Sequence, residues 1–297
     1  MKKSLKSAII VFMAITAAVS ISLPGYGQKK NKETKTKEKT SDGIKLEYNF
    51  PADKALSYSS LTTVKQEMDY NGSTMEVNVS IVLACTINST GKDKENLKLN
   101  VRVDTLSQKV DSPQGSSGGI IDEIAGKSFT MILAPNGKEV DVTDAEKLTY
   151  TADGNQTNAS QSFTDYFPDL PVNSLKPGDT WASNDTLKSK ATSMSMKQFV
   201  HADNKFEGVV TVDGVECAKI TAVLKGTREQ TGQNMGMDLS IKGDFTGTAE
   251  LYFAIKDGYL VKQSSTSKMT GIIDISGAQS MSMPLTATTE SVKWLKK

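Results

Sequence analysis

Side chains that commonly carry out catalysis or bind metals are scarce in this sequence of 297 residues. His201 is its only histidine, and its two cysteines, Cys85 and Cys217, are far apart in the chain. A zinc site would therefore need carboxylates alone, and no acidic run has the spacing of a calcium-binding loop. The glycine-rich motifs that bind nucleotide phosphates do not occur either. We expect neither a metal nor a cofactor.

One segment does match an enzyme motif. Gly115–Gly119 reads GSSGG and fits the G-x-S-x-G pattern that presents a serine nucleophile. That pattern is meaningful on a strand-to-helix turn of a parallel α/β sheet, whereas this copy follows Pro113 in a stretch rich in glycine and serine. We expect a flexible loop here and no enzyme.

Pairs of carboxylates are the remaining route to catalysis. The residues after position 42 include 31 acids, which offer many pairs, so a hydrolase that uses two carboxylates stays an alternative. Nothing in the sequence singles out one pair. Two of them read as turn and capping residues, namely Asp141 with Asp144 and Asp165 with Asp169.

The methionines give the stronger indication of a binding surface. Seven of the ten that follow residue 27 come after residue 190, and Ser-Met-Ser-Met occurs twice, at Ser193–Met196 and Ser280–Met283. In a strand, each copy would place two flexible, polarizable thioethers on one face, which suits variable apolar partners. The alternative is that these side chains simply fill the core. The candidate ligand-binding residues are Met194, Met196, Met281 and Met283.

Two triplets have the form Asp-Thr-Leu, at Asp104–Leu106 and Asp185–Leu187. They resemble the acceptor of an O-glycosylation system of some Gram-negative bacteria. They are equally compatible with residues at strand edges, so both interpretations stay open.

The beginning of the chain differs in composition from the rest. Residues 1–27 have the pattern of a secretory signal, with a basic start, an apolar run over Ala8–Val19 and small residues before Gln28. Pro24 ends the apolar stretch too early for a helix that spans a membrane. Residues 28–42 contain no apolar side chain and are expected to form a disordered polar tether. We therefore expect an exported protein of the periplasm or the extracellular space, not membrane-spanning after cleavage.

Charge and cysteine content limit the partners and the covalent links. The first 42 residues hold nine of the 35 basic and three of the 34 acidic side chains, so the rest carries 26 and 31, a net charge of −5. No electrostatic footprint for nucleic acid is expected. A disulfide between Cys85 and Cys217 is chemically allowed in an exported chain. Cys85 also lies on the apolar face of an expected strand, which favours a buried thiol, and the choice stays open.

Alternation of apolar and polar residues indicates strands throughout the chain. The longest run is Met75–Ile87, preceded by Asn71-Gly72, a pair that suits a tight hairpin turn. Further strands are expected at Ile44–Phe50, Leu97–Val103, Phe129–Ala134 and Val140–Val142. The only helix that we expect lies within Asp144–Phe167, where Thr164–Phe167 would form a short turn before Pro168.

The chain also shows weak internal similarity. Leu97–Val110 corresponds to Cys217–Gln230, and Phe129–Gly137 corresponds to Leu251–Gly258, at an offset of about 120 residues. We predict an all-β, mainly antiparallel fold of two similar halves that form curved sheets or partly open barrels, with at most one or two short helices. The halves are residues 43–166 and 182–297, joined by the proline-rich connector Phe167–Trp181.

The connector carries a resemblance to known proteins. Its sequence FPDLPVNSLKPGDTW, with the later hairpin segment Val212–Cys217, resembles a family of uncharacterised exported β proteins of Gram-negative bacteria. The resemblance covers residues 44–296 and implies no particular activity. In outline, long antiparallel strands after a signal peptide are similar to periplasmic lipid and lipoprotein carriers of the LolA and LppX type. That similarity concerns the fold alone, because no motif residue is shared.

Together these features predict a non-enzymatic binding protein of the periplasm or cell envelope. Its expected ligand is apolar, a lipid or an acyl chain, held in a concave β sheet. The alternative is a structural or interaction protein whose sheet edges pair with another envelope protein.

Overall fold

The computed structural model describes residues 43–70, 72–152, 155–191, 194–234, 237–277 and 280–296. The expected signal peptide and the expected polar tether lie outside these residues. None of the helices in the described residues has the length and the apolar run needed to cross a membrane.

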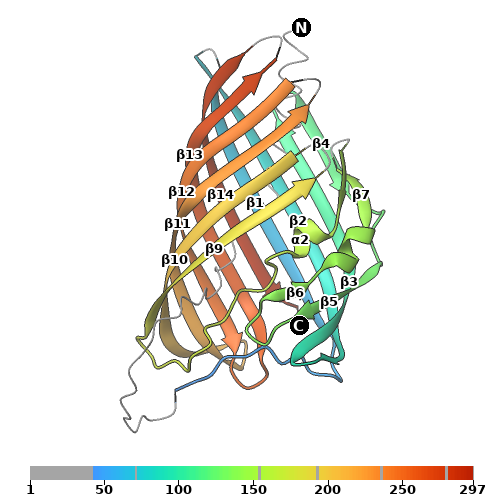
Figure 1. Cartoon of the computed structure of the whole chain (residues 1–297), viewed down its shortest axis with the longest axis vertical. Coiled ribbons are helices and arrows are strands. Elements are labelled where there is room, and N and C mark those ends of the chain that lie inside the picture. Colours follow the sequence, from blue (N-terminus) through green and yellow to red (C-terminus); the bar gives the residue numbers. More distant parts are fainter. Residues whose placement is uncertain are drawn as a thin grey trace.

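A single antiparallel sheet of 12 strands makes up most of the molecule. Its strands are β1 (Leu56–Tyr70), β2 (Ser73–Asp93), β3 (Asn96–Ser112), β4 (Gly115–Ile120), β5 (Ser128–Leu133), β6 (Glu139–Asp141), β9 (Thr180–Ala191), β10 (Met194–Val212), β11 (Val215–Asn234), β12 (Met237–Ala254), β13 (Tyr259–Ser276) and β14 (Met281–Leu295). Their order is β6-β5-β3-β2-β1-β14-β13-β12-β11-β10-β9, with β4 beside β3. Figure 1 shows the sheet curling around a concave face, although it does not close into a barrel. The predicted all-β, antiparallel fold class is confirmed.

The alternation of residue types explains which face of each strand is buried. In β2, every second residue from Met75 to Leu83 points to the concave side and is buried or half-buried. A bulge between Ala84 and Cys85 then shifts the register against β3. Long strands with bulges bend, and bending gives this sheet its concave face.

Residues 139–152 and 155–170, which we call the cover, lie across the opening of the curved sheet (Figure 1). After β6 the cover contains the 3₁₀ helix η1 (Thr143–Lys147), the hairpin of β7 (Thr149–Ala152) and β8 (Asn155–Asn158), and the short helix α2 (Ser160–Phe163). The expectation of at most two short helices is confirmed. The helix expected within Asp144–Phe167 is present as α2, but it ends before the expected turn at Thr164–Phe167, where Thr164 is extended and Asp165 has a positive φ of 58°.

The expected strand Ile44–Phe50 is an extended segment outside the sheet. Its side chains alternate as predicted, and Leu46, Tyr48 and Phe50 are buried. Its backbone N–H groups, however, bond to three different places, the carbonyls of residues 135, 175 and 258, instead of to one strand. The segment therefore crosses the end of the sheet and closes the main hydrophobic core.

Two glycine turns allow this segment to pack closely. A Cβ atom on Gly137 would lie 2.5 Å from the Tyr48 ring, and one on Gly258 would lie 2.7 Å from the backbone of Glu47 and Asn49. Both glycines have positive φ. These two turns, at the ends of β5 and β12, occupy corresponding positions in the internal similarity of the sequence. The duplication itself stays a prediction.

The connector is packed into the same core. The Phe167 ring contacts four other rings at centroid distances of 5.1–6.1 Å, those of Tyr48, Phe50, Tyr58 and Tyr166. Tyr48 also donates a hydrogen bond to the carbonyl oxygen of Pro168. The start of the connector thus anchors the end of the cover to the sheet.

Two further expectations are settled by the fold. Cys85 and Cys217 are both free and buried, so the disulfide does not form. The expected Gly/Ser loop is instead strand β4, which pairs with β3 along its whole length. The glycines offer little side-chain packing, but the backbone ladder to β3 is sufficient to order this segment.

Candidate functional site

A group of polar side chains lies in the middle of the concave face. The register of β13, β14 and β1 places them in three neighbouring rows: Gln263, Lys293 and Ser60; Ser265, Ser291 and Thr62; Ser267 and Thr289. We call these eight residues the polar band. Five of them are less than a tenth exposed, although none has an apolar side chain. Buried polar groups need partners, so this band has to meet other polar groups, water or a ligand.

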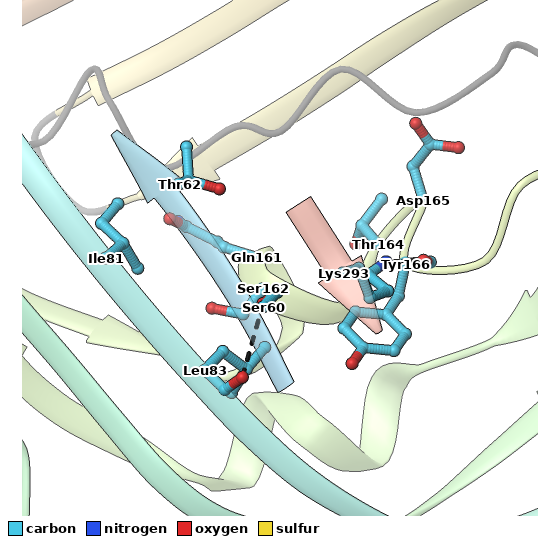
Figure 2. Close-up of a pocket in the computed structure, with 10 residues that line it drawn as sticks. All are labelled: Ser60, Thr62, Ile81, Leu83, Gln161, Ser162, Thr164, Asp165, Tyr166 and Lys293. Carbon is cyan, nitrogen blue, oxygen red and sulfur yellow. Dashed lines mark hydrogen bonds between the residues drawn. The ribbon is translucent and has the colours of Figure 1, made fainter. Parts of the chain in front are cut away.

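Residues of the cover lie opposite part of the polar band. A cavity of about 50 Å³ lies between them, and we call it the lysine cavity. Its lining residues, drawn in Figure 2, are Ser60, Thr62, Ile81, Leu83, Gln161, Ser162, Thr164, Asp165, Tyr166 and Lys293. Eight of these ten residues can form hydrogen bonds through their side chains, so the cavity suits polar groups.

Lys293 is the charged residue that β14 contributes to this cavity. Only 8% of the residue is exposed, and its Nζ lies 3.6 Å from the centre of the Tyr166 ring. The ammonium also donates to the carbonyl oxygen of Tyr166. Burial lowers the pKa of Lys293 from its ordinary value of 10.5 to about 8, because the charged form is poorly solvated there. At neutral pH the group is still mainly a cation.

A second hollow, which we call the acidic cleft, adjoins the lysine cavity. It has a volume of about 260 Å³ and shares Thr164 and Asp165 with the cavity. Its other lining residues come from the turn before β6, from the cover and from β9: Asn136, Lys138, Glu139, Val142, Asp169, Asn184, Asp185 and Leu187. In Figure 2 the carboxylate of Asp165 points away from Lys293.

Three carboxyl groups of the acidic cleft have raised pKa values. Burial raises the pKa of Glu139 to about 7, although its carboxylate accepts a hydrogen bond from the Phe167 N–H at 3.0 Å. Burial, followed by the charge of Asp185, raises the pKa of Asp169 to about 7. Burial and neighbouring carboxylates raise the pKa of Asp165 well above its ordinary value. Within the described ranges, no three acidic, histidine or cysteine side chains are arranged to hold a metal ion.

The four candidate methionines lie elsewhere on the concave face. Strand register places them in two adjacent rows that cross five strands. The first row is Met194, Gly232, Leu239, Ile275 and Met281, and the second is Met196, Gln230, Ile241, Ile273 and Met283. The fold therefore brings the two Ser-Met-Ser-Met segments to the same level of the sheet.

Five residues of these rows, Leu239, Ile241, Ile273, Ile275 and Met283, belong to a second apolar cluster, which we call the methionine end, and Met194 and Met281 pack against it. Its buried members are Val64, Met68, Met75, Val77, Val79, Val110, Leu239, Ile241, Ile273, Ile275, Met283, Leu285 and Ala287. Met283 is 1% exposed and Met196 is 7% exposed, whereas Met194 and Met281 are half-buried. None of the four lines the lysine cavity or the acidic cleft.

The remaining motif residues do not assemble a catalytic site. Ser117 lies on β4 at one side of the sheet, and His201 lies on β10 near the opposite edge. The His201 ring instead contacts Asn184 at 2.8 Å and Asp203 at 3.2 Å. Of the two Asp-Thr-Leu triplets, Thr186 is exposed on edge strand β9, and Thr105 is half-buried on β3.

Sequence reasoning missed Lys293, Glu139 and the convergence of Asp165 with Asp169. The signal for Lys293 was available, because in β14 it occupies the inward register that begins with Met281, Met283 and Leu285. A lysine on the inward face of a strand is unusual and marks a buried charge. The acidic cleft had no such signal, since its members come from distant parts of the chain.

Comparisons with known proteins give no family. No family model matches the sequence, and no curated protein matches it. Among solved structures, Pseudomonas aeruginosa OccK2 (OpdF) is 7% identical, with 83% of this chain and 99% of that chain covered and a TM-score of 0.21. The same protein in complex with glucuronate gives 6% identity, 84% and 100% coverage and a TM-score of 0.22. A DUF1329 family protein from Desulfovibrio piger is 9% identical, with 81% of this chain and 85% of that chain covered and a TM-score of 0.14. Similarity at this level does not indicate a function.

Proposed function

We propose that this chain is a non-enzymatic binding protein that holds a small polar ligand between the concave face of its sheet and the cover. The observation that carries the proposal is the pair of adjoining hollows, the lysine cavity and the acidic cleft, which share Thr164 and Asp165. Concave sites with a few convergent polar groups are the usual places where proteins bind small molecules.

The backbone at the junction of the two hollows supports this proposal. Asp165 has a φ of 58°, in the left-handed region that costs energy for residues other than glycine. Such strained positions cluster at ligand sites, where the surrounding structure maintains them. Phe167, two residues later, is buried among four rings and fixes the chain in place.

The pKa values favour binding over hydrolysis. A pair of carboxylates that acts as acid and base needs environments that push their pKa values apart. In the acidic cleft, burial raises the pKa values of Glu139, Asp165 and Asp169 in the same direction, so these three carboxyl groups do not form such a separated pair. The same pattern suits a cleft that accepts hydrogen-bonding or cationic groups.

The location that we propose is outside the cytoplasm, in the periplasm or the extracellular space. The support is the sequence pattern of residues 1–27, with its apolar run over Ala8–Val19. A polar ligand bound there would be a solute or the head group of a larger molecule.

An apolar ligand at the methionine end is the second candidate. The observation in its favour is that Met194 and Met281, at opposite ends of one row, are only half-buried. A lipid or acyl chain could contact this row at the rim of the sheet. Against it, Met196 and Met283 are buried by other side chains of the protein.

Ligand-detected NMR on the purified full chain distinguishes the candidates. The probes are glycerol, lactate and L-alanine on the polar side and palmitate on the apolar side. We expect a polar probe to bind and Thr62→Val, which removes a buried hydroxyl of the lysine cavity, to weaken its binding. Thr63→Val is the matched control, because Thr63 is exposed on the opposite face of β1.

The opposite result would overturn the proposal. Binding of palmitate alone, lost when Met194 and Met281 are replaced by Ser, would establish the apolar ligand. Failure of every probe would direct the search to protein partners at the sheet edges, where β9 pairs on one side only.

A further inference from the structure

We propose that the ligand carries a carboxylate and that Lys293 binds it in the lysine cavity. This inference rests on the proposed function and names the chemical class of its ligand. It predicts a monocarboxylate whose remaining part is neutral or cationic.

The first argument is the state of the Lys293 side chain. In the part of the chain that the structure describes, its ammonium forms no ion pair. Its contacts are the carbonyl oxygen and the ring face of Tyr166. A buried charge without a counter-ion is costly, and proteins rarely keep one without a use. An anion that enters the cavity would supply the missing partner.

The second argument is the set of donors around the ammonium. The Gln161 amide and the hydroxyl groups of Thr62 and Ser162 line the same cavity, whereas the lining hydroxyls of Ser60 and Thr164 already donate to the carbonyl oxygens of Leu83 and Ser160. In Figure 2 the Gln161 and Ser162 side chains of α2 face β1 and β2 across it. A carboxylate is an acceptor with about four lone-pair sites, so it could accept from the ammonium and from these remaining donors together.

The third argument is a buried amide oxygen next to Lys293, without a hydrogen-bond partner in the described part of the chain. Gln263 is the direct neighbour of Lys293 on β13 and is 6% exposed. Its Oε1 is buried and has no hydrogen-bond partner among the described residues. A buried amide oxygen without a partner is destabilising, and a bound polar molecule or water relieves it.

The size and charge of the two hollows define the rest of the ligand. The lysine cavity, at about 50 Å³, has room for one or two groups of the size of a water molecule at about 30 Å³ each, so it would hold the carboxylate alone. The remainder of the ligand would pass Thr164 and Asp165 into the acidic cleft. Because Glu139, Asp169 and Asp185 line that cleft, a second carboxylate on the ligand would be repelled there.

The titratable groups around Lys293 define how binding depends on pH. They are Cys85 on β2, Glu139 on β6, and Asp165 and Tyr166 after α2. Glu139 and Asp165 favour the charged ammonium from a distance, whereas burial opposes it. Carboxylate binding should therefore persist at and below neutral pH and should weaken above about pH 8, where the lysine loses its proton.

The test is isothermal titration of the full chain with lactate, L-alanine, L-alaninamide and malate. We expect lactate or L-alanine to bind, L-alaninamide to fail because it lacks the carboxylate, and malate to bind more weakly. Lys293→Met should lower the affinity for the bound carboxylate at least about tenfold, the scale of one charge-assisted contact. Lys262→Met is the matched control, since Lys262 is exposed on the neighbouring strand β13.

A second measurement does not need a variant. The affinity of the wild-type chain for lactate should fall between pH 7 and pH 9.5, and the affinity for glycerol should not. Unchanged carboxylate binding in Lys293→Met, or equal binding of L-alaninamide, would overturn the inference. If glycerol binds and depends on Thr62 but no carboxylate binds through Lys293, the proposed function stands and this inference alone fails. If only palmitate binds, the proposed function itself fails.

Discussion

The methionine end and the polar band share strands β1, β13 and β14, yet the methionine end buries mainly apolar side chains and the polar band buries polar ones. Along β14 the inward side chains run Met283, Leu285 and Ala287, and then Thr289, Ser291 and Lys293. Strand β13 shows a similar change from apolar to polar side chains, whereas β1 is mixed, with buried Gln66 beside Ala287 and Val64 beside Thr289. The change occurs at one level of the sheet, so it separates two regions of the concave face.

The difference shows which part of the concave face is filled by side chains and which part contains cavities. At the methionine end, facing strands contribute apolar side chains that pack against each other, and Met196 and Met283 are covered without any other molecule. At the polar band the sheet meets a short cover, and two hollows remain. Flexible methionine suits a core that has to be filled irregularly, whereas fixed hydroxyl and amide groups suit a site.

The largest expected effect tests whether the methionine end is a filled core. Met283→Ala should lower the free energy of unfolding by about 2–4 kcal/mol, because it leaves a cavity among buried neighbours. Met283→Leu, which conserves volume, should cost less than about 1.5 kcal/mol. Urea unfolding measures both. A loss under about 1 kcal/mol in the alanine variant would mean that this region is a loosely packed surface.

The next prediction concerns the buried charge of the polar band. Lys293→Met should leave the free energy of unfolding at pH 7 unchanged or raise it by about 1–3 kcal/mol, because it removes an ammonium that lacks a counter-ion. The advantage should shrink as the pH rises from 8 to 10.5. In that window the unfolded wild-type chain binds more protons than the folded one, whose lysine pKa is about 8, so wild-type stability increases.

The measurement is chemical unfolding of both chains between pH 7 and pH 10.5. Buried Cys85, whose pKa burial raises to about 12 although Lys293 lowers it, opposes this trend in both chains, so the comparison depends on the difference between the two curves. A stability loss of more than about 2 kcal/mol in Lys293→Met at pH 7, without ligand, would show that the lysine mainly fastens the cover through Tyr166.

A smaller effect is expected at the acidic cleft. The folded pKa of Glu139, about 7, lies above its ordinary value of 4.5, so the folded chain binds the proton more tightly and loses stability as the pH rises through this window. Glu139→Gln should therefore stabilise the protein by about 1–2 kcal/mol at pH 8 and have no effect at pH 4. The amide oxygen can still accept the Phe167 N–H.

Thermal unfolding at the two pH values tests this prediction, with Glu146→Gln as the control on the exposed surface of η1. Equal stability of Glu139→Gln and wild type at both pH values would mean that the Glu139 carboxylate is well solvated.

The contrast between the two regions also explains what the sequence could predict. The all-β class and most strands followed from period-two alternation, because a half-buried strand imposes that pattern wherever it lies. The methionine segments were identified, and their shared register on β10 and β14 is compatible with either of their interpretations. Local pattern was enough for these features.

The site depends on contacts that no local pattern encodes. Glu139, Asp165 and Asp185 converge only because the cover folds back onto β9, and Asp165 with Asp169 looked like ordinary turn residues. Ile44–Phe50 had the alternation of a strand, yet its N–H groups bond to three separate segments. Alternation predicts which side of an extended segment is buried, but it does not specify the hydrogen-bonding partner.

The smallest expected effect separates core from rim within the methionine end itself. Met194 begins the row that ends at Met281 and is half-buried, and its sulfur accepts only a long contact from Gln230 Nε2 at 3.8 Å. Met194→Ala should therefore cost about 0.5–1 kcal/mol, well below Met283→Ala, because solvent can occupy the space that is left. Ser195→Ala, on the exposed face of β10, is the control and should stay within about 0.5 kcal/mol of wild type. A cost for Met194→Ala equal to that of Met283→Ala would show that the rim is as closed as the core. The apolar-ligand candidate would then lose the one observation in its favour, and the polar band would be left as the binding region of the concave face.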